Sequence, residues 1–166
     1  MTKIMLPHIG EIDSLSLKDY YSVDVDFNGN NVSIDVNFEQ ETIEPAKLTA
    51  VKRVLENIGS YDAKNRKYIL DDYNDEEGDN VKSYLQHHLE EFDEDTLSSL
   101  MDFDITEISH EEQLLKQLHL IRIGFYPDGD DHFITFDYSL NPDITNYLVV
   151  ILTDENGELN YMTLES

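Results

Sequence analysis

The residues with the clearest potential for chemistry are three aspartates that alternate along two neighbouring segments. Asp24 and Asp26 alternate with apolar residues in one segment, and Asp35 does so in the next, across an Asn/Gly turn. This pattern predicts a β-hairpin, and a shared apolar face places Val25 opposite Ile34. The same register sets Asp24 opposite Asp35, with Asp26 diagonal to it. Facing carboxylates repel each other, so a hard cation such as Ca²⁺ or Mg²⁺, a basic side chain from elsewhere, or plain solvent must relieve them.

A second polar group is predicted near the C-terminus. Alternating runs on both sides of Asp128-Gly129 predict another hairpin. Its register places Arg122 diagonal to Asp137 and near Thr135, and it puts Leu120 on the same face as Arg122. If this face is open, the group is a small polar site. The alternative is a structural cross-strand ion pair.

Other motifs for chemistry are incomplete in this sequence. His87 and His88 are neighbours on a predicted helix, so they diverge by about 100° and cannot easily share a metal. The stretch 71–80 resembles a calcium loop, but Glu77 stands where the turn glycine is required and Ser83 where a bidentate glutamate is required. The absence of cysteine excludes thiolate catalysis and cysteine-ligated zinc. We expect no catalytic residue, no cofactor and a non-enzymatic protein; the alternative is a divalent-cation-binding module or a metal-dependent enzyme that uses Asp24, Asp26 and Asp35.

Charge is the strongest signal in the composition. The chain has 36 acidic and 11 basic residues and a net charge of -25, so it should repel nucleic acid and anionic membranes and attract cations or basic proteins. Residues 71–112 contain sixteen acids and one base, Lys82, whereas residues 46–70 contain six bases and two acids. This distribution predicts an acidic surface for a basic protein partner, and the alternative is that acidity only maintains solubility. The expected surface residues are Asp71, Asp72, Asp75, Glu76, Glu77, Glu90, Glu91, Asp93, Glu94 and Asp95.

The candidate residues described above must be positioned by strands and helices, which the sequence also predicts. Four alternating runs between Leu118 and Ser166 predict an antiparallel meander. Pro45 opens a helical region that extends to Gln117, with a break between its first two helices at Gly59-Ser60. We therefore expect a single α+β domain. It would combine an antiparallel sheet, made by the N-terminal hairpin and the four-strand meander, with a central helical segment packed on one face.

The last predicted hairpin, around Asn156-Gly157, is apolar on both faces. Val149 and Ile151 alternate with Val150 and Leu152, so both sides of the strand are apolar. Strands of this kind are usually covered on both faces. The second cover would be the N-terminal segment, a partner or a twin subunit, so a homodimer through this hairpin is one expectation.

The sequence also bears on location. The start, MTKIMLPHIGEID, has no long apolar core and turns acidic at once, unlike a signal peptide. The longest apolar run, Tyr147 to Leu152, is too short to span a bilayer. We expect a cytoplasmic protein without a membrane partner.

The C-terminal third carries a family resemblance. From D-H-F-I-T-F-D-Y-S-L through N-Y-L-V-V-I-L-T-D-E-N-G-E-L-N-Y-M-T-L-E-S, the chain resembles the uncharacterised bacterial family DUF two-thousand-four, in which a late hairpin closes on D-E-N-G-E and ends M-x-L/M-E-S. That family has no established activity, so the resemblance implies no site residue. In size, charge and expected architecture the chain is also similar to small acidic immunity proteins of bacterial toxin systems, which implies a protein partner.

Overall fold

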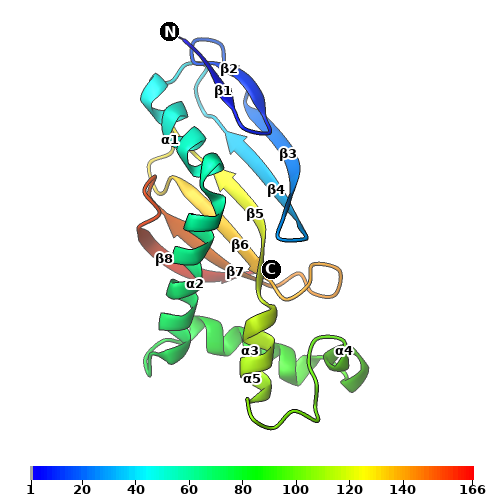
Figure 1. Ribbon diagram of the computed structural model, residues 1–166. Coiled ribbons are helices and arrows are strands. Elements are labelled where there is room, and N and C mark those ends of the chain that lie inside the picture. The colour runs from blue at the N-terminus through cyan, green and yellow to red at the C-terminus, as the bar shows by residue number, and fades with distance from the viewer. Residues whose placement is uncertain (1) are drawn as a thin grey trace.

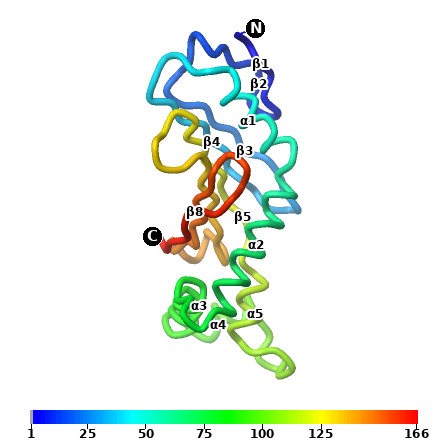
Figure 2. The backbone as a smooth tube through the Cα atoms, turned by 90° about the vertical axis from the view of Figure 1, so that its left-hand side faces the viewer, coloured from blue at the N-terminus to red at the C-terminus, as the bar shows by residue number. Residues whose placement is uncertain are grey.

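Two N-terminal hairpins, a helical segment and four further strands follow one another along the chain. The computed structural model describes residues 2–166, and it is elongated in both views of Figures 1 and 2. The elements are β1 (Lys3–Leu6), β2 (Gly10–Asp13), β3 (Tyr20–Phe27), β4 (Asn30–Asn37), α1 (Pro45–Glu56), α2 (Ile58–Asn74), α3 (Asn80–Glu91), α4 (Glu94–Ser98), α5 (His110–Gln117), β5 (His119–Phe125), β6 (Ile134–Ser139), β7 (Leu148–Thr153) and β8 (Leu159–Glu165).

The larger sheet joins the second hairpin to the C-terminal meander. Its strand order is β3-β4-β5-β6-β7-β8, while β1 and β2 form a separate two-stranded sheet. The predicted antiparallel meander of β5 to β8 is confirmed, but the sheet as a whole is mixed because β4 and β5 pair in parallel. A purely antiparallel sheet was therefore the wrong expectation. The whole helical segment connects β4 to β5, and such a long crossover lets the chain return in the same direction.

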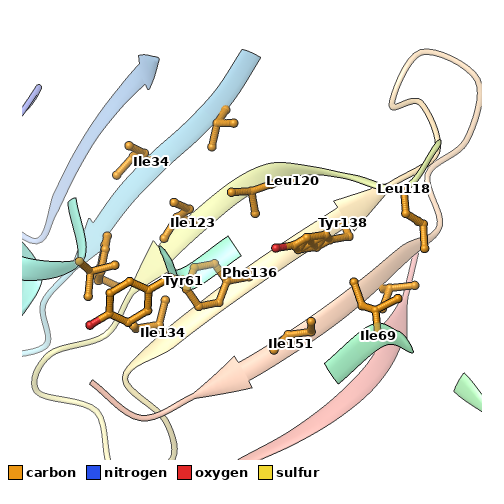
Figure 3. Packing of buried hydrophobic residues seen from close by; sticks show 14 of the residues in the cluster. Ile34, Tyr61, Ile69, Leu118, Leu120, Ile123, Ile134, Phe136, Tyr138 and Ile151 are labelled. Carbon is orange, nitrogen blue, oxygen red and sulfur yellow. The ribbon is translucent and has the colours of Figure 1, made fainter. Parts of the chain in front are cut away.

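The main core lies between this sheet and the first two helices. Ile34, Ile123, Phe136 and Ile151 come from four adjacent strands and are all fully buried (Figure 3). Tyr61 of α2 stacks on Phe136, with ring centroids 6.5 Å apart. The helical segment does not cover the sheet evenly, however. Helices α1 and α2 run along one face, whereas α3, α4 and α5 gather at the end of the molecule opposite β1 and β2 (Figure 1).

The break between the first two helices lies at Asn57 rather than at Gly59-Ser60. Asn57 leaves the helical conformation with φ of -135° and ψ of 36°. Its side-chain amide donates to the Arg53 carbonyl oxygen at 2.8 Å, so the side chain competes with the helix for a backbone partner. Gly59 and Ser60 are ordinary helical residues of α2.

The turn of the second hairpin is shorter than predicted. Asn28 and Gly29 both have positive φ, 53° and 84°, as a two-residue type I′ turn requires. The shorter turn moves the pairing by two residues, so Val25 pairs with Val32 and not with Ile34. A shift of two keeps every side chain on its predicted face. The predicted alternation was correct and the predicted partners were wrong.

A β-bulge in β5 decides which way Arg122 points. Leu120 pairs with Tyr138 and is 2% exposed in the core, whereas Arg122 pairs with Asp137 on the opposite face. The extra residue between them is Ile121. Residues two apart in a regular strand share a face, so the predicted shared face of Leu120 and Arg122 was wrong. Bulges commonly re-aim a side chain in this way, and here the arginine turns to the face without helices.

The helix-free face is apolar over β7, as the sequence predicted. Val150 and Leu152 are 4% and 6% exposed there, and their cross-strand neighbours in β6 are Asp137 and Thr135. The N-terminal segment, one of the covers considered, forms β1 and β2 at the far end of the molecule and does not lie on β7 (Figure 1). The single chain already buries these two side chains, so they need no second cover, and a twin subunit or another partner on this hairpin stays a prediction.

Candidate functional site

The three hairpin aspartates do not assemble into a cation site. Asp24 pairs with Ser33, whose hydroxyl donates to its Oδ1 at 2.9 Å, and Asp26 is exposed further along β3. Asp35 lies beside β5, where Arg122 binds both of its oxygens. Within residues 2–166, no three histidine, aspartate or glutamate side chains are grouped so that they could hold a metal ion. A basic side chain from elsewhere relieves Asp35, which is one of the three possibilities that the sequence allowed.

Arg122 is the centre of a buried polar network on the helix-free face. Its Nε and Nη2 donate to the two oxygens of Asp35 at 2.8 and 2.9 Å, and its Nη1 donates to Asp137 Oδ2 at 3.3 Å. Nη2 also donates to the Tyr126 hydroxyl at 2.9 Å, and the Asn37 amide donates to Asp35 at 2.7 Å. The side chains of Asp35 and Asp137 are 7% and 9% exposed, and that of Arg122 is 30% exposed. The network therefore joins β4, β5 and β6.

Gly124 makes room for the guanidinium. It lies between Asp35 on β4 and Thr135 on β6. A Cβ at Gly124 would come within 2.5 Å of Arg122 Nη2 and within 2.9 Å of Cζ. Two carboxylates hold the guanidinium in that place, so it has no easy way to move. The absence of a side chain at Gly124 is part of the network.

Burial and charge act in opposite directions on the ionisable groups. Burial on its own lowers the pKa of Arg122, but hydrogen bonds to Asp35 and Tyr126 and the carboxylate charges raise it, so the guanidinium stays charged. Burial raises the pKa of Asp137, although the charge of Arg122 acts against this rise. A guanidinium has five N–H groups, and four of them are already bonded inside the protein. This arrangement favours the structural ion pair over a site that recognises an anion.

Thr135 belongs to a neighbouring contact rather than to the network. Its hydroxyl lies 2.7 Å from His132 Nε2. The His132 ring meets the Tyr126 ring edge-on, with centroids 5.1 Å apart, and burial lowers the pKa of His132. The structure thus places Arg122, Thr135 and Asp137 on one face, as predicted, but the predicted diagonal register was wrong, because Arg122 pairs directly with Asp137 and Thr135 pairs with Gly124. The sequence did not indicate Asp35 or His132 as their companions.

The ten predicted acidic surface residues form two groups. One group, residues 71–77, lies at the end of α2 and in the loop to α3, and the other, residues 90–95, lies at the end of α3 and the start of α4. Nine of the ten are exposed, and Asp72 is half-buried. Helix α3 has 12 residues, which is about 18 Å of length, so the two groups are separated by roughly that distance. Both lie at the helical end of the molecule (Figure 2).

Three of these acids accept backbone hydrogen bonds within the protein, and for Asp75 the donor is the Glu77 N–H at 3.0 Å. The Asp72 carboxylate accepts from the Val81 backbone N–H at 2.8 Å and so caps α3 from outside that helix. Asp93 accepts from the Thr96 N–H at 2.8 Å and caps α4. These carboxylates already accept hydrogen bonds from the backbone. They therefore add negative charge to the surface, but they offer fewer free oxygen acceptors to a partner.

The remaining charge of this end is not compensated by the chain itself. Among residues 2–166, none of the sixteen acids between 71 and 112 forms an ion pair. Three of the six bases of α1 and α2 are bonded elsewhere. Arg53 and Lys64 bond to the turn between β7 and β8, and Arg66 pairs with Asp62 in its own helix. The acidic end therefore keeps a large excess of negative charge, with Lys82 as the one basic residue between 71 and 112.

Comparison of the chain with protein-family models, with curated proteins and with solved structures finds no match. The resemblance of the C-terminal third to DUF two-thousand-four stays a sequence-based expectation. No helix in the part of the chain that the structure describes is long and apolar enough to cross a bilayer.

Proposed function

We propose that the protein is a non-enzymatic, cytoplasmic binding protein whose acidic end, residues 71–77 and 90–95, docks a basic partner protein. The observation that carries this proposal is that none of these acids is paired with a basic residue within residues 2–166. Like charges held together on one end of a protein repel, and cationic side chains of a partner relieve that repulsion. Size and charge agree with an immunity-type role, in which the partner is a toxin.

The geometry sets a requirement for such a partner. The partner's cations must reach two exposed acidic groups at the two ends of α3. These groups are roughly 18 Å apart, because α3 has 12 residues. Opposite fields speed association at low salt, and salt weakens them. A partner held in this way should therefore bind fast and lose affinity as salt rises.

Three variants with the same net charge test the proposal. Each neutralises four exposed acids and leaves the capping residues Asp72 and Asp93 intact. They are D71N/D75N/E76Q/E77Q, E90Q/E91Q/E94Q/D95N and, as a control at the other end of the molecule, D19N/E39Q/E41Q/E44Q.

The wild-type chain is used to capture partners from lysate at low salt, and each recovered protein is purified and titrated against the four chains. We expect a basic protein whose affinity falls in both acidic-end variants, and falls between about 0.1 M and about 1 M salt, but is unchanged in the control. Equal weakening by the control would assign the effect to net charge alone. A partner insensitive to salt and to all three variants would overturn the proposal.

A further inference from the structure

We propose that the partner is held by strand addition: an extended basic segment pairs with the free edge of β8, next to Asp71 and Asp75. This inference rests on the proposed function, because it uses the group at residues 71–77. The inference adds main-chain hydrogen bonds at the edge of β8 to the electrostatic attraction of the acidic groups.

The two edges of the large sheet differ. The outer strands are β3 and β8, and within residues 2–166 β8 pairs only with β7. Strand β3 carries Asp24 and Asp26, whereas β8 reads LNYMTLE, with Glu165 as its one charged residue and no proline. Natural proteins usually protect an edge with charge, proline or a bulge. Strand β8 has an irregularity at Asn160 and a regular edge beyond it.

The free edge is accessible and partly apolar. Figure 2 views the molecule from the side on which β8 lies, and the strand is at the front. Leu159 and Tyr161 are 41% and 49% exposed. An added strand would gain main-chain hydrogen bonds from the edge and apolar contact from these two side chains.

A hollow beside β8 identifies the chemistry of the added strand. It has a volume of about 280 Å³, with an apolar part made by β8 and an acidic part made by the helices. Asp71 in its wall is exposed and makes no side-chain hydrogen bond or ion pair between Thr2 and Ser166. The residues that line the hollow are Tyr68, Asp71, Asp72, Asp75, Asn80, Leu159 and Met162.

Side chains of an added strand would alternate between the two faces of the sheet, so every second one would point toward this hollow. Lysine and arginine fit it best, because their aliphatic stems can lie on Leu159 and Met162 while their charged heads reach Asp71 and Asp75. The same charges disfavour a second copy of this chain at the edge. Two copies joined through β8 would add the acidic groups of two chains that each carry a charge of -25.

Peptide probes separate pairing from charge. One probe is a synthetic peptide of about ten residues in which lysine alternates with valine, long enough to match a typical strand. The second has the same sequence with N-methylated backbone amides, which keeps the charge and removes the hydrogen-bond donors. Binding to the full chain is measured by fluorescence anisotropy, and amide hydrogen exchange is followed in β8.

We expect the unmodified peptide to bind and to slow exchange in β8, and the methylated peptide to bind roughly tenfold or more weakly. D71N/D75N should weaken the unmodified peptide, and the matched pair E90Q/E91Q should not. Equal binding of both peptides with unchanged exchange in β8 would overturn strand addition and leave the electrostatic proposal standing. A dimer that protects β8 without peptide, seen by light scattering, would assign the edge to a second copy instead. If neither peptide binds while the natural partner still depends on residues 71–77, strand addition alone is wrong.

Discussion

Two arginines, one on each face of the large sheet, bind buried carboxylates by different routes. On the helix face, Arg66 pairs with Asp62 one turn away in α2 at 3.1 Å and also donates to the Leu118 carbonyl oxygen. On the helix-free face, Arg122 pairs with Asp35 and Asp137, which come from the two strands on either side of its own strand. The first pair is local and the second joins segments far apart in the sequence.

The two pairs also differ in how much they depend on their arginine. Asp62 keeps a second partner, because Tyr138 donates its hydroxyl hydrogen to Asp62 at 2.6 Å, and Arg66 is 44% exposed to solvent. Asp35 keeps the Asn37 amide as a second donor, whereas Asp137 has only Arg122 as a side-chain donor within residues 2–166, and Arg122 is 30% exposed. Solvent weakens the contribution of an exposed ion pair. The Arg122 network on the helix-free face should therefore contribute more to stability than the Arg66 pair does.

The largest expected effect comes from Arg122→Met, which keeps the aliphatic stem and removes the charge. It leaves two buried carboxylates without their cation, and breaking a buried pair in this way costs about 3–5 kcal/mol. Urea denaturation at neutral pH, with unchanged circular dichroism as a control for folding, measures the loss in the free energy of unfolding. A loss below about 1 kcal/mol would mean that the cluster behaves as a surface pair.

The same variant has a pH signature. Burial raises the pKa of Asp137 above its unfolded value, so the folded form takes up this proton first as the pH falls. The cost of a charged Asp137 is thus present above the folded pKa and disappears below the unfolded one. Without Arg122 this pKa should rise further, so the deficit of Arg122→Met should shrink between about pH 7 and about pH 4. A deficit independent of pH would contradict this electrostatic origin.

The next effect is expected on the helix face, for Tyr138→Phe. Burial and the charge of Asp62 raise the pKa of Tyr138, so its hydroxyl remains a neutral donor. Removal of this donor leaves one oxygen of buried Asp62 without its bond, at a cost of about 1.5–3 kcal/mol. Thermal denaturation compared with that of Tyr126→Phe, which removes a hydroxyl near Arg122, measures the difference. Equal losses would show that Asp62 needs Tyr138 no more than Arg122 needs Tyr126.

Gly124→Ala tests the room that the guanidinium needs. The new methyl group would overlap Arg122 Nη2, and overpacking of this kind costs about 1–3 kcal/mol. A double variant with Arg122→Met supplies the control, because the methyl group should cost much less once the guanidinium is gone. Additive losses would mean that Gly124 matters for another reason.

The same comparison shows where sequence reasoning succeeds and where it stops. Alternation predicted the meander and set Arg122 near Asp137, because both belong to consecutive strands. It missed Asp35, because local patterns do not say which strand lies beside β4 after a helical segment of five helices. The bulge at Ile121 was equally hidden, since Leu120, Ile121 and Ile123 are all apolar and leave no mark in the pattern.

The acidic surface shows a similar limit. Charge counts predicted an acidic surface made by ten residues between 71 and 95, and nine of these ten are exposed. The counts could not show that α3 divides them into two groups, or that Asp72 caps α3 from another helix. Hydrogen-bonding roles depend on positions in space, and those positions come from packing.

The smallest effect, and the sharpest test of the comparison, is expected for Arg66→Met. It is the same substitution as at Arg122, but the lost charge is half-exposed and Asp62 keeps the Tyr138 hydroxyl, so the cost should be about 1 kcal/mol or less. In a Tyr138→Phe background the cost should rise, because Asp62 would then lose both partners, and a double-mutant cycle measures this coupling. If Arg66→Met alone costs as much as Arg122→Met, then neither the sequence separation of a pair nor the exposure of its arginine sets its contribution to stability. The burial of the carboxylate, which both pairs share, would then set it.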